Sequence, residues 1–276
     1  MSAASGGARS PFGLALTAGF FSIIPMPVLT QLGTDETRRA LRWFPTLGAL
    51  FGIAAGAVGA GTLLLSGSQL LAATLVVLVW QALTGAMHLD GLADSFDGLA
   101  ALGSHKEGRD AARALEIMRT PDTGAMGVAA IVLALLVQVA ALAAAPDAEA
   151  LFALAILAPM TGRAAVLVAS RPGVPAARKG GFGALFHEVT PLGQIIVQLI
   201  VLAAASALLG WWVAGFLGAL GLVGALVIAL GVSVVWVHRL TSTFAGLTGD
   251  LFGALIEVTT TVTALAAALM LAAVRG

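Results

Sequence analysis

Long stretches without charged residues dominate the hydrophobic pattern of this chain. Residues 51–87, 123–146 and 189–237 contain no Asp, Glu, Lys or Arg. A helix of about 20 apolar residues crosses a bilayer, so each stretch holds one or two spans. In lipid only helices and closed barrels satisfy their backbone, and apolar runs this long are helices. The pattern predicts about seven spans, near residues 46–66, 70–89, 125–145, 150–170, 193–210, 216–238 and 251–273.

The apolar segment 11–24 is short for a span, and Pro25 and Pro27 follow it. We expect a short N-terminal helix that is amphipathic and interfacial, or re-entrant; an eighth span is the alternative. The predicted fold is therefore all-α, a polytopic integral membrane helical bundle. We find no linker or repeat, so residues 1–276 are expected to form a single membrane-embedded catalytic domain. Glycines such as Gly56, Gly59, Gly218, Gly221 and Gly224 indicate close helix packing.

Composition supports this picture and excludes others. Hydrophobic residues make up 59% of the chain and charged residues 10%, whereas soluble domains have about 25% charged residues. A soluble globular protein and a nucleic-acid binder are therefore excluded. The chain has no cysteine, which excludes disulfides, thiolate metal sites and cysteine nucleophiles.

Basic residues cluster in segments 30–45, 90–123 and 171–190, and the intervening turns at 67–69, 146–149 and 211–215 carry none. Cytoplasmic loops carry an excess of Lys and Arg. We therefore expect the basic segments to face the cytoplasm, with the protein in the cytoplasmic (inner) membrane and its active site on that face.

Asp90, Asp94 and Asp97 form an acidic cluster after the span predicted at 70–89. At 100° per residue they lie within about 60° of arc on one helix face. Like charges at this spacing repel, and we expect the cluster at the end of a helix, where the helix dipole disfavours acids. A bound cation would remove these penalties, and hard oxygen ligands suit Mg²⁺ or Mn²⁺. The alternative is a solvated acidic helix end.

Several basic residues near the cluster are candidate ligands of substrate phosphates. Segment 108–119 predicts a short amphipathic helix, which alternatively contacts lipid phosphates. A glycine-rich loop follows Arg178 and Lys179, and a positive-inside loop explains it equally well. Arg163 lies inside a predicted span, where it marks function or extends toward the interface. The candidate phosphate-binding set is Arg109, Arg113, Glu116, Arg119, Arg163, Arg178 and Lys179.

Asp250 and Glu257 share one face of the last predicted span. We expect Asp250 at its cytoplasmic end, in the same site as the acidic cluster. Glu257 lies within the span and needs a partner such as Arg163 or a metal, because an unpaired carboxylate in lipid is costly.

Four segments together resemble the cobalamin synthase (adenosylcobinamide-GDP ribazoletransferase) family. They are Phe20 to Pro27, His88 to Gly98, Leu115 to Arg119 with Gly124 to Val128, and Leu247 to Asp250 with Gly253, Ala254 and Glu257. They occur in the family's order and cover most of the chain. The resemblance implies an Mg²⁺-dependent membrane transferase that joins adenosylcobinamide-GDP to α-ribazole, or its 5′-phosphate, and releases GMP.

The resemblance suggests roles for the polar residues. Asp90, Asp94, Asp97 and Asp250 are candidate metal ligands, and Mn²⁺ is an alternative to Mg²⁺. Asp97, Asp250 and Glu257 are candidate catalytic carboxylates, with the general base unassigned, and His88 is a further site candidate. The expected partners are the two substrates and the bilayer, without nucleic acid; a homo-oligomer is compatible with the sequence. Other open interpretations are an aspartate-rich prenyltransferase, an enzyme like the CDP-alcohol phosphotransferases, and, less favoured, a transporter.

Overall fold

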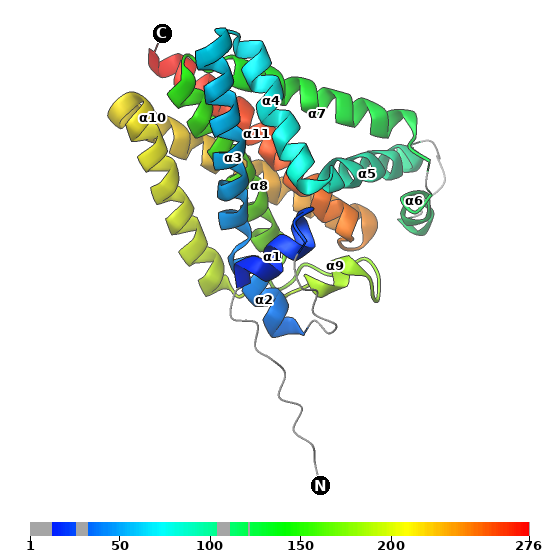
Figure 1. Cartoon of the computed structure of the whole chain (residues 1–276). Helices are drawn as coiled ribbons and strands as arrows, with labels where there is room; N and C mark the ends of the chain where they lie inside the picture. The colour runs from blue at the N-terminus through cyan, green and yellow to red at the C-terminus, as the bar shows by residue number, and fades with distance from the viewer. Residues whose placement is uncertain (1–12, 26–32, 104–110, 121, 276) are drawn as a thin grey trace.

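The computed structural model describes residues 13–25, 33–103, 111–120 and 122–275. Within them the chain is all-α (Figure 1), and the only strand-like feature is an isolated bridge between Ala176 and Leu247. The helices are α1 (Gly13–Phe21), α2 (Thr34–Arg42), α3 (Phe44–Ser66), α4 (Gln69–Thr84), α5 (Met87–Gly103), α6 (Ala111–Ile117), α7 (Ala125–Ala143), α8 (Ala148–Ala169), α9 (Phe182–Leu185), α10 (Leu192–Phe244) and α11 (Gly249–Arg275).

In the described part of the chain, five helical stretches are long and apolar enough to cross a membrane, or six if the bent pair α4 and α5 is one span. The protein is thus a polytopic membrane bundle, as predicted. The count differs from seven because α10 contains two predicted spans in 53 residues, and because α4 has only 16 residues. Helix α1 has nine residues, too few to cross a bilayer core of about 30 Å.

Helix α8 is the centre of the bundle, and almost all of its residues are buried. It lies beside α3 because glycines leave room on the facing side of α3 (Figure 1). A Cβ at Gly48 would lie 2.4 Å from the Pro159 oxygen, and one at Gly52 would lie 2.4 Å from the Ile156 Cα. The expected close packing also holds at Gly56, whose Cβ would meet Phe152 at 2.9 Å. Small residues therefore set the distance between these two helices.

The span predicted at 70–89 is wrong at its C-terminal end. Helix α4 ends at Thr84, where Gly85 adopts a left-handed conformation with φ 60°, and α5 then departs at 89°. The acidic cluster therefore belongs to a new helix, α5, and does not end α4. Asp90 lies in the first turn of α5, where the helix dipole favours an acid, contrary to our expectation.

Helix α10 consists of two helical arms joined at Ala214 and Gly215, whose backbone is not helical. The bend is tight, because a Cβ on Gly210 before it would lie 2.2 Å from the Gly218 backbone oxygen after it. This bend separates the spans predicted at 193–210 and 216–238, so both predictions correspond to real helical arms. Close packing extends to Gly221, but a Cβ on Gly224 would meet nothing within 4 Å.

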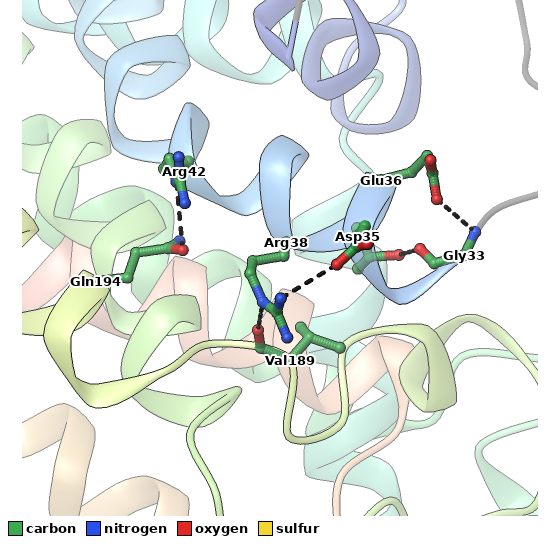
Figure 2. Close-up of polar contacts among 8 residues, drawn as sticks. Gly33, Asp35, Glu36, Arg38, Arg42, Val189 and Gln194 are labelled. Carbon is green, nitrogen blue, oxygen red and sulfur yellow. Dashed lines mark hydrogen bonds and ion pairs between the residues drawn. The ribbon is translucent and has the colours of Figure 1, made fainter. Parts of the chain in front are cut away.

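Helix α2 lies against the segment that leads into α10 (Figure 2). Arg38 donates from Nε to the Val189 oxygen at 3.0 Å and pairs with Asp35 at 3.2 Å. Gln198 donates to the Arg42 oxygen at 2.8 Å. These contacts hold the end of the bundle where α1, α2 and α9 gather (Figure 1).

Candidate active site

Helices α5 and α11 meet at two glycines, and this contact creates the candidate site. A Cβ on Gly91 would lie 2.6 Å from the backbone carbonyl oxygen of Asp250, and one on Gly253 would lie 3.4 Å from the Gly91 Cα. Only glycines permit the two backbones to approach so closely. The contact brings the acidic cluster next to Asp250 across a long stretch of sequence, as the sequence predicted.

The carboxylates of this region influence one another. Asp90, Asp250 and Asp97 all act electrostatically on Asp94. Asp90 is exposed, while Asp94 and Asp250 are half-buried. Neither Asp90 nor Asp94 has an ion pair within 4 Å in the described residues. The site therefore concentrates negative charge without an ion pair to Asp90 or Asp94 in this part of the chain.

Asp97 has a role that the sequence did not indicate. Its Oδ2 accepts a hydrogen bond from the Gly124 amide at 2.7 Å, and its Oδ1 accepts one from the Gly127 amide at 2.8 Å. Gly124 is the N-cap of α7. Asp97 thus caps the N-terminus of α7, where a negative charge is favourable. Metal binding and catalysis by Asp97 remain predictions.

Whether the aspartates fit a metal ion depends on the other ligands that the ion brings, such as a substrate phosphate. Among the described residues, no group of three or more His, Asp and Glu side chains is already arranged to hold a metal. Mg²⁺, however, commonly uses one or two carboxylates together with substrate phosphates and waters. Asp90, Asp94 and Asp250 supply suitable hard oxygens. The residues therefore fit Mg²⁺ that binds with a phosphate ligand, and do not form a complete three-carboxylate cage.

Arg178 brings positive charge to the edge of the site. Its Nη2 donates to the Leu115 oxygen of α6 and thereby ties the loop before α9 to α6. Burial and the nearby Arg119 guanidinium lower the pKa of Arg178, whereas Asp250 acts in the opposite direction. The charges of Arg178, Arg119 and Asp250 therefore influence one another, and guanidinium groups are suited to bind a phosphate.

The remaining candidates for phosphate binding include the acidic Glu116 as well as basic residues. Arg113, Glu116 and Lys179 are exposed, on α6 or in the loop before α9. Helix α6 covers Ala111–Ile117, and the start of the predicted helix at 108–110 lies outside the described residues. Arg109 lies outside the described residues, so its predicted role has no structural counterpart.

Glu257 is buried at 3% exposure in α11, and its partners differ from those predicted. Its Oε1 accepts hydrogen bonds from Gln81 of α4 at 3.1 Å and Gln138 of α7 at 2.7 Å. No ion pair joins Glu257 to Arg163 within 4 Å in the described chain, although the two charges interact electrostatically. Two neutral amides therefore satisfy the carboxylate that we expected to need a cation.

Arg163 is buried in α8, away from any phosphate position on the surface. It donates from Nη1 to the Pro159 oxygen at 3.1 Å and lies over the Phe51 ring at 5.2 Å. Arg163 and Glu257 line a cavity of about 10 Å³ together with His88, enough for about one water. His88 Nε2 and Arg163 Nε have no protein partner there, so a water is a suitable ligand for both atoms.

A larger cavity of about 210 Å³ lies at the junction of α5 and α11. Asp90 and Asp250 line it, and so does His88, which contacts both cavities. Its other lining is mainly apolar and includes four phenylalanines, Phe21, Phe44, Phe186 and Phe252. A concave, mostly apolar site with a few polar groups is typical of a small-molecule pocket.

The fold and this site define an integral membrane protein with a mainly apolar pocket that two aspartates and a histidine also line. Residues 13–268 match the cobalamin-5-phosphate synthase family. An adenosylcobinamide-GDP ribazoletransferase of Pseudomonas syringae pv. syringae (strain B728a) is 36% identical over 249 residues, 90% of this chain and 94% of the relative. The chain therefore belongs to the cobalamin-5-phosphate synthase family, a family of enzymes.

Further relatives carry the same name. That of Roseiflexus sp. (strain RS-1) is 36% identical over 258 residues, 91% of this chain and 87% of the relative. That of Corynebacterium efficiens (strain DSM 44549) is 32% identical over 283 residues, 96% of this chain and 94% of the relative. No solved structure matches the chain.

Proposed function

We propose that this enzyme transfers the cobinamide-phosphate group of adenosylcobinamide-GDP to the ribose hydroxyl of α-ribazole, or of its 5′-phosphate, and releases GMP. The observation that carries the proposal is the meeting of Asp90 and Asp250 at a pocket, with Asp94 electrostatically coupled to both and Arg178 coupled to Asp250. The name of the relatives, adenosylcobinamide-GDP ribazoletransferase, supports the same substrates.

The reaction is a displacement at the phosphorus that carries the cobinamide. A bond forms between the ribose oxygen and this phosphorus, and the bond from the phosphorus to the bridging oxygen of the diphosphate breaks. The electron pair leaves with GMP, and the hydroxyl proton passes to a base. Positioning and charge stabilisation supply most of the catalysis in such transfers.

Arg119 and Arg178 are suited to hold the GMP phosphate. Arg119 lowers the pKa of Arg178, so the two positive charges repel each other. A phosphate relieves this repulsion and accepts paired hydrogen bonds from each planar guanidinium. Arg113, Lys179 and Arg109 remain further candidates for phosphate contacts.

Asp90, Asp94 and Asp250 would hold Mg²⁺, with Mn²⁺ as an alternative, together with the diphosphate. When bound, the ion supplies neutralisation of the charge that develops on the phosphate oxygens. Asp250 also lines the pocket, and we assign to it the acceptance of the ribazole hydroxyl proton. Its Oδ2 accepts a hydrogen bond from Thr248 at 3.4 Å, which orients the carboxylate.

The membrane setting belongs to the proposal as well. The basic segments that hold Arg38, Arg42, Arg119 and Arg178 would face the cytoplasm of the inner membrane under the positive-inside rule. The large anionic corrinoid substrate would then approach this basic face from the cytoplasm.

The test is GMP release from adenosylcobinamide-GDP by the purified protein in lipid nanodiscs. We expect release only when both α-ribazole and Mg²⁺ are present. Equal release without α-ribazole would identify a hydrolase, and no release with all components would overturn the proposed reaction. Full activity in excess EDTA would overturn the metal assignment alone.

A further inference from the structure

The aromatic lining of the 210 Å³ cavity is a continuous cluster built from four separate segments. Phe44 of α3 and Phe21 of α1 have ring centroids 4.2 Å apart. Phe186, after α9, lies 5.5 Å from Phe21 and 6.0 Å from Phe252 of α11. All four rings are buried and line the cavity. The short N-terminal helix therefore contributes directly to this pocket.

The size of the cavity restricts its ligand. Buried apolar cavities of about 150 Å³ bind benzene, and pockets for drug-sized ligands start at about 300 Å³. A volume of about 210 Å³ therefore holds a bicyclic aromatic ring, but not a corrinoid macrocycle.

The chemistry of the lining restricts the ligand further. Phenylalanine rings favour stacking or edge contacts with a flat apolar ring. Guanine carries several donors and acceptors on its edges, and most would lack partners among these rings, which is costly. A benzimidazole has few polar edges. Asp90 and Asp250, at the same cavity, are acceptors for the hydroxyls of an attached sugar.

We propose that this cavity binds the dimethylbenzimidazole base of α-ribazole, with the ribose directed toward Asp90 and Asp250. The inference rests on the proposed function and adds the position of the nucleophilic substrate. GDP then lies outside the aromatic cluster, on the side of Arg119 and Arg178. The acceptor hydroxyl is thereby held beside the carboxylates while the ring is shielded from water.

The first test separates the two substrates by their KM values. Phe186→Leu and Phe252→Leu should each raise the KM for α-ribazole about three- to tenfold, the scale of an aromatic contact. The KM for adenosylcobinamide-GDP should stay within about twofold of the native value. The matched control is Phe152→Leu on α8, where Phe152 packs edge-on against Trp212 at 6.1 Å; it should change neither KM.

A second variant tests the pocket by filling it, with a readout that misfolding does not produce. Val166 of α8 lines the cavity, and Val166→Phe should reduce its volume. We expect kcat/KM to shift at least about tenfold toward benzimidazole riboside over the dimethylbenzimidazole riboside, since methyl-sized differences in a pocket are worth that much. An unchanged ratio in an active variant would overturn the assignment.

The outcomes for the pocket and for the reaction are distinguishable. If native protein releases GMP but the phenylalanine variants change the KM of adenosylcobinamide-GDP instead, the base pocket is wrong and the reaction stands. If native protein releases no GMP, the proposed function fails, and equilibrium dialysis with α-ribazole alone decides the pocket. Weaker α-ribazole binding by Phe186→Leu and Phe252→Leu, but not by Phe152→Leu, would support the pocket. Unchanged binding by the first two variants would overturn it.

Discussion

Two acidic regions of this enzyme share helix α11 but differ in how their charges are satisfied. At the junction of α5 and α11, Asp90, Asp94 and Asp250 are exposed or half-buried and influence one another. Two turns further along α11, Glu257 is buried and accepts hydrogen bonds from Gln81 and Gln138. In the described residues the first region has no ion pair within 4 Å, whereas one oxygen of Glu257 has two amide donors.

This difference indicates different uses for the two regions. Repelling carboxylates destabilise a protein unless a ligand binds them, so the first region is suited to a cation and a phosphate substrate. A buried carboxylate with two amide donors links the helices that carry them. We therefore expect substitutions in the first region to reduce turnover and substitutions in the second to reduce stability.

The largest expected effect is on turnover in the first region. Asp94→Asn keeps the side-chain shape but removes the charge that Asp90, Asp97 and Asp250 all feel. GMP release should fall at least about 100-fold, the scale of one key electrostatic group. The unfolding temperature should stay equal or rise, because repulsion is relieved. Glu149→Gln, at an exposed position of α8, is the control, and near-native turnover of Asp94→Asn would refute the assignment.

The next effect tests the second region through stability. Glu257→Leu leaves the Gln81 and Gln138 amides without their acceptor, which should cost about 2–3 kcal/mol of folding free energy. Glu257→Gln preserves an oxygen for both donors and should cost much less. Thermal unfolding in one fixed detergent measures both. Equal loss in the two variants would show that charge, and not the amide contacts, sets the stability of this region.

Asp97 connects the two regions, because it lies in the acidic cluster but has protein partners. Asp97→Ala removes both hydrogen bonds to the N-terminus of α7 and should lower stability by about 1–2 kcal/mol. Unlike Asp94→Asn, it should lower the unfolding temperature. If Asp97→Ala unfolds at the native temperature yet loses turnover, Asp97 acts as a ligand or catalytic group and its cap is unimportant.

The contact that assembles the first region can be disturbed without changing any carboxylate. A Cβ on Gly91 would lie 2.6 Å from the backbone carbonyl oxygen of Asp250, so Gly91→Ala must move α5 away from α11. We expect at least about a tenfold loss of turnover, since small displacements are costly in positioned reactions. Gly61→Ala in α3, where a Cβ meets nothing within 4 Å, should leave turnover unchanged. Equal turnover in both variants would mean that the contact is unimportant.

Most of the fold was predictable because charge-free runs report membrane helices directly. The approach of Asp250 to the acidic cluster was predictable because carboxylates at the ends of membrane helices are rare, and both were expected on the same face of the membrane. The break after α4 was missed, since Gly85 and Ala86 are apolar and continue the hydrophobic pattern. Gly85 indicates a helix end only if its ease in adopting a left-handed backbone conformation is considered.

The partners of the candidate site residues were less predictable. Gln81 and Gln138 are uncharged, so a search for charges inside spans did not identify them as ligands of Glu257. The partners of Asp97 are backbone amides, which no side-chain pattern reports. The four phenylalanines of the cavity come from separate segments, and only the tertiary fold brings them together.

The smallest effect concerns the bend that joins the two regions. Helix α4 carries Gln81 of the buried region, α5 carries Asp90 of the open one, and Ala86 between them has φ 57°. This left-handed conformation costs alanine about 1–2 kcal/mol, while glycine adopts it freely but loses more entropy on folding. Ala86→Gly should therefore gain at most about 1 kcal/mol of stability and keep native turnover. Ala86→Val, whose branched side chain fits this conformation poorly, should lose stability and turnover together. The measurements are the thermal unfolding temperature and the GMP release of Ala86→Gly and Ala86→Val. A stable, active Ala86→Val variant would show that the bend does not need a left-handed residue to position Asp90.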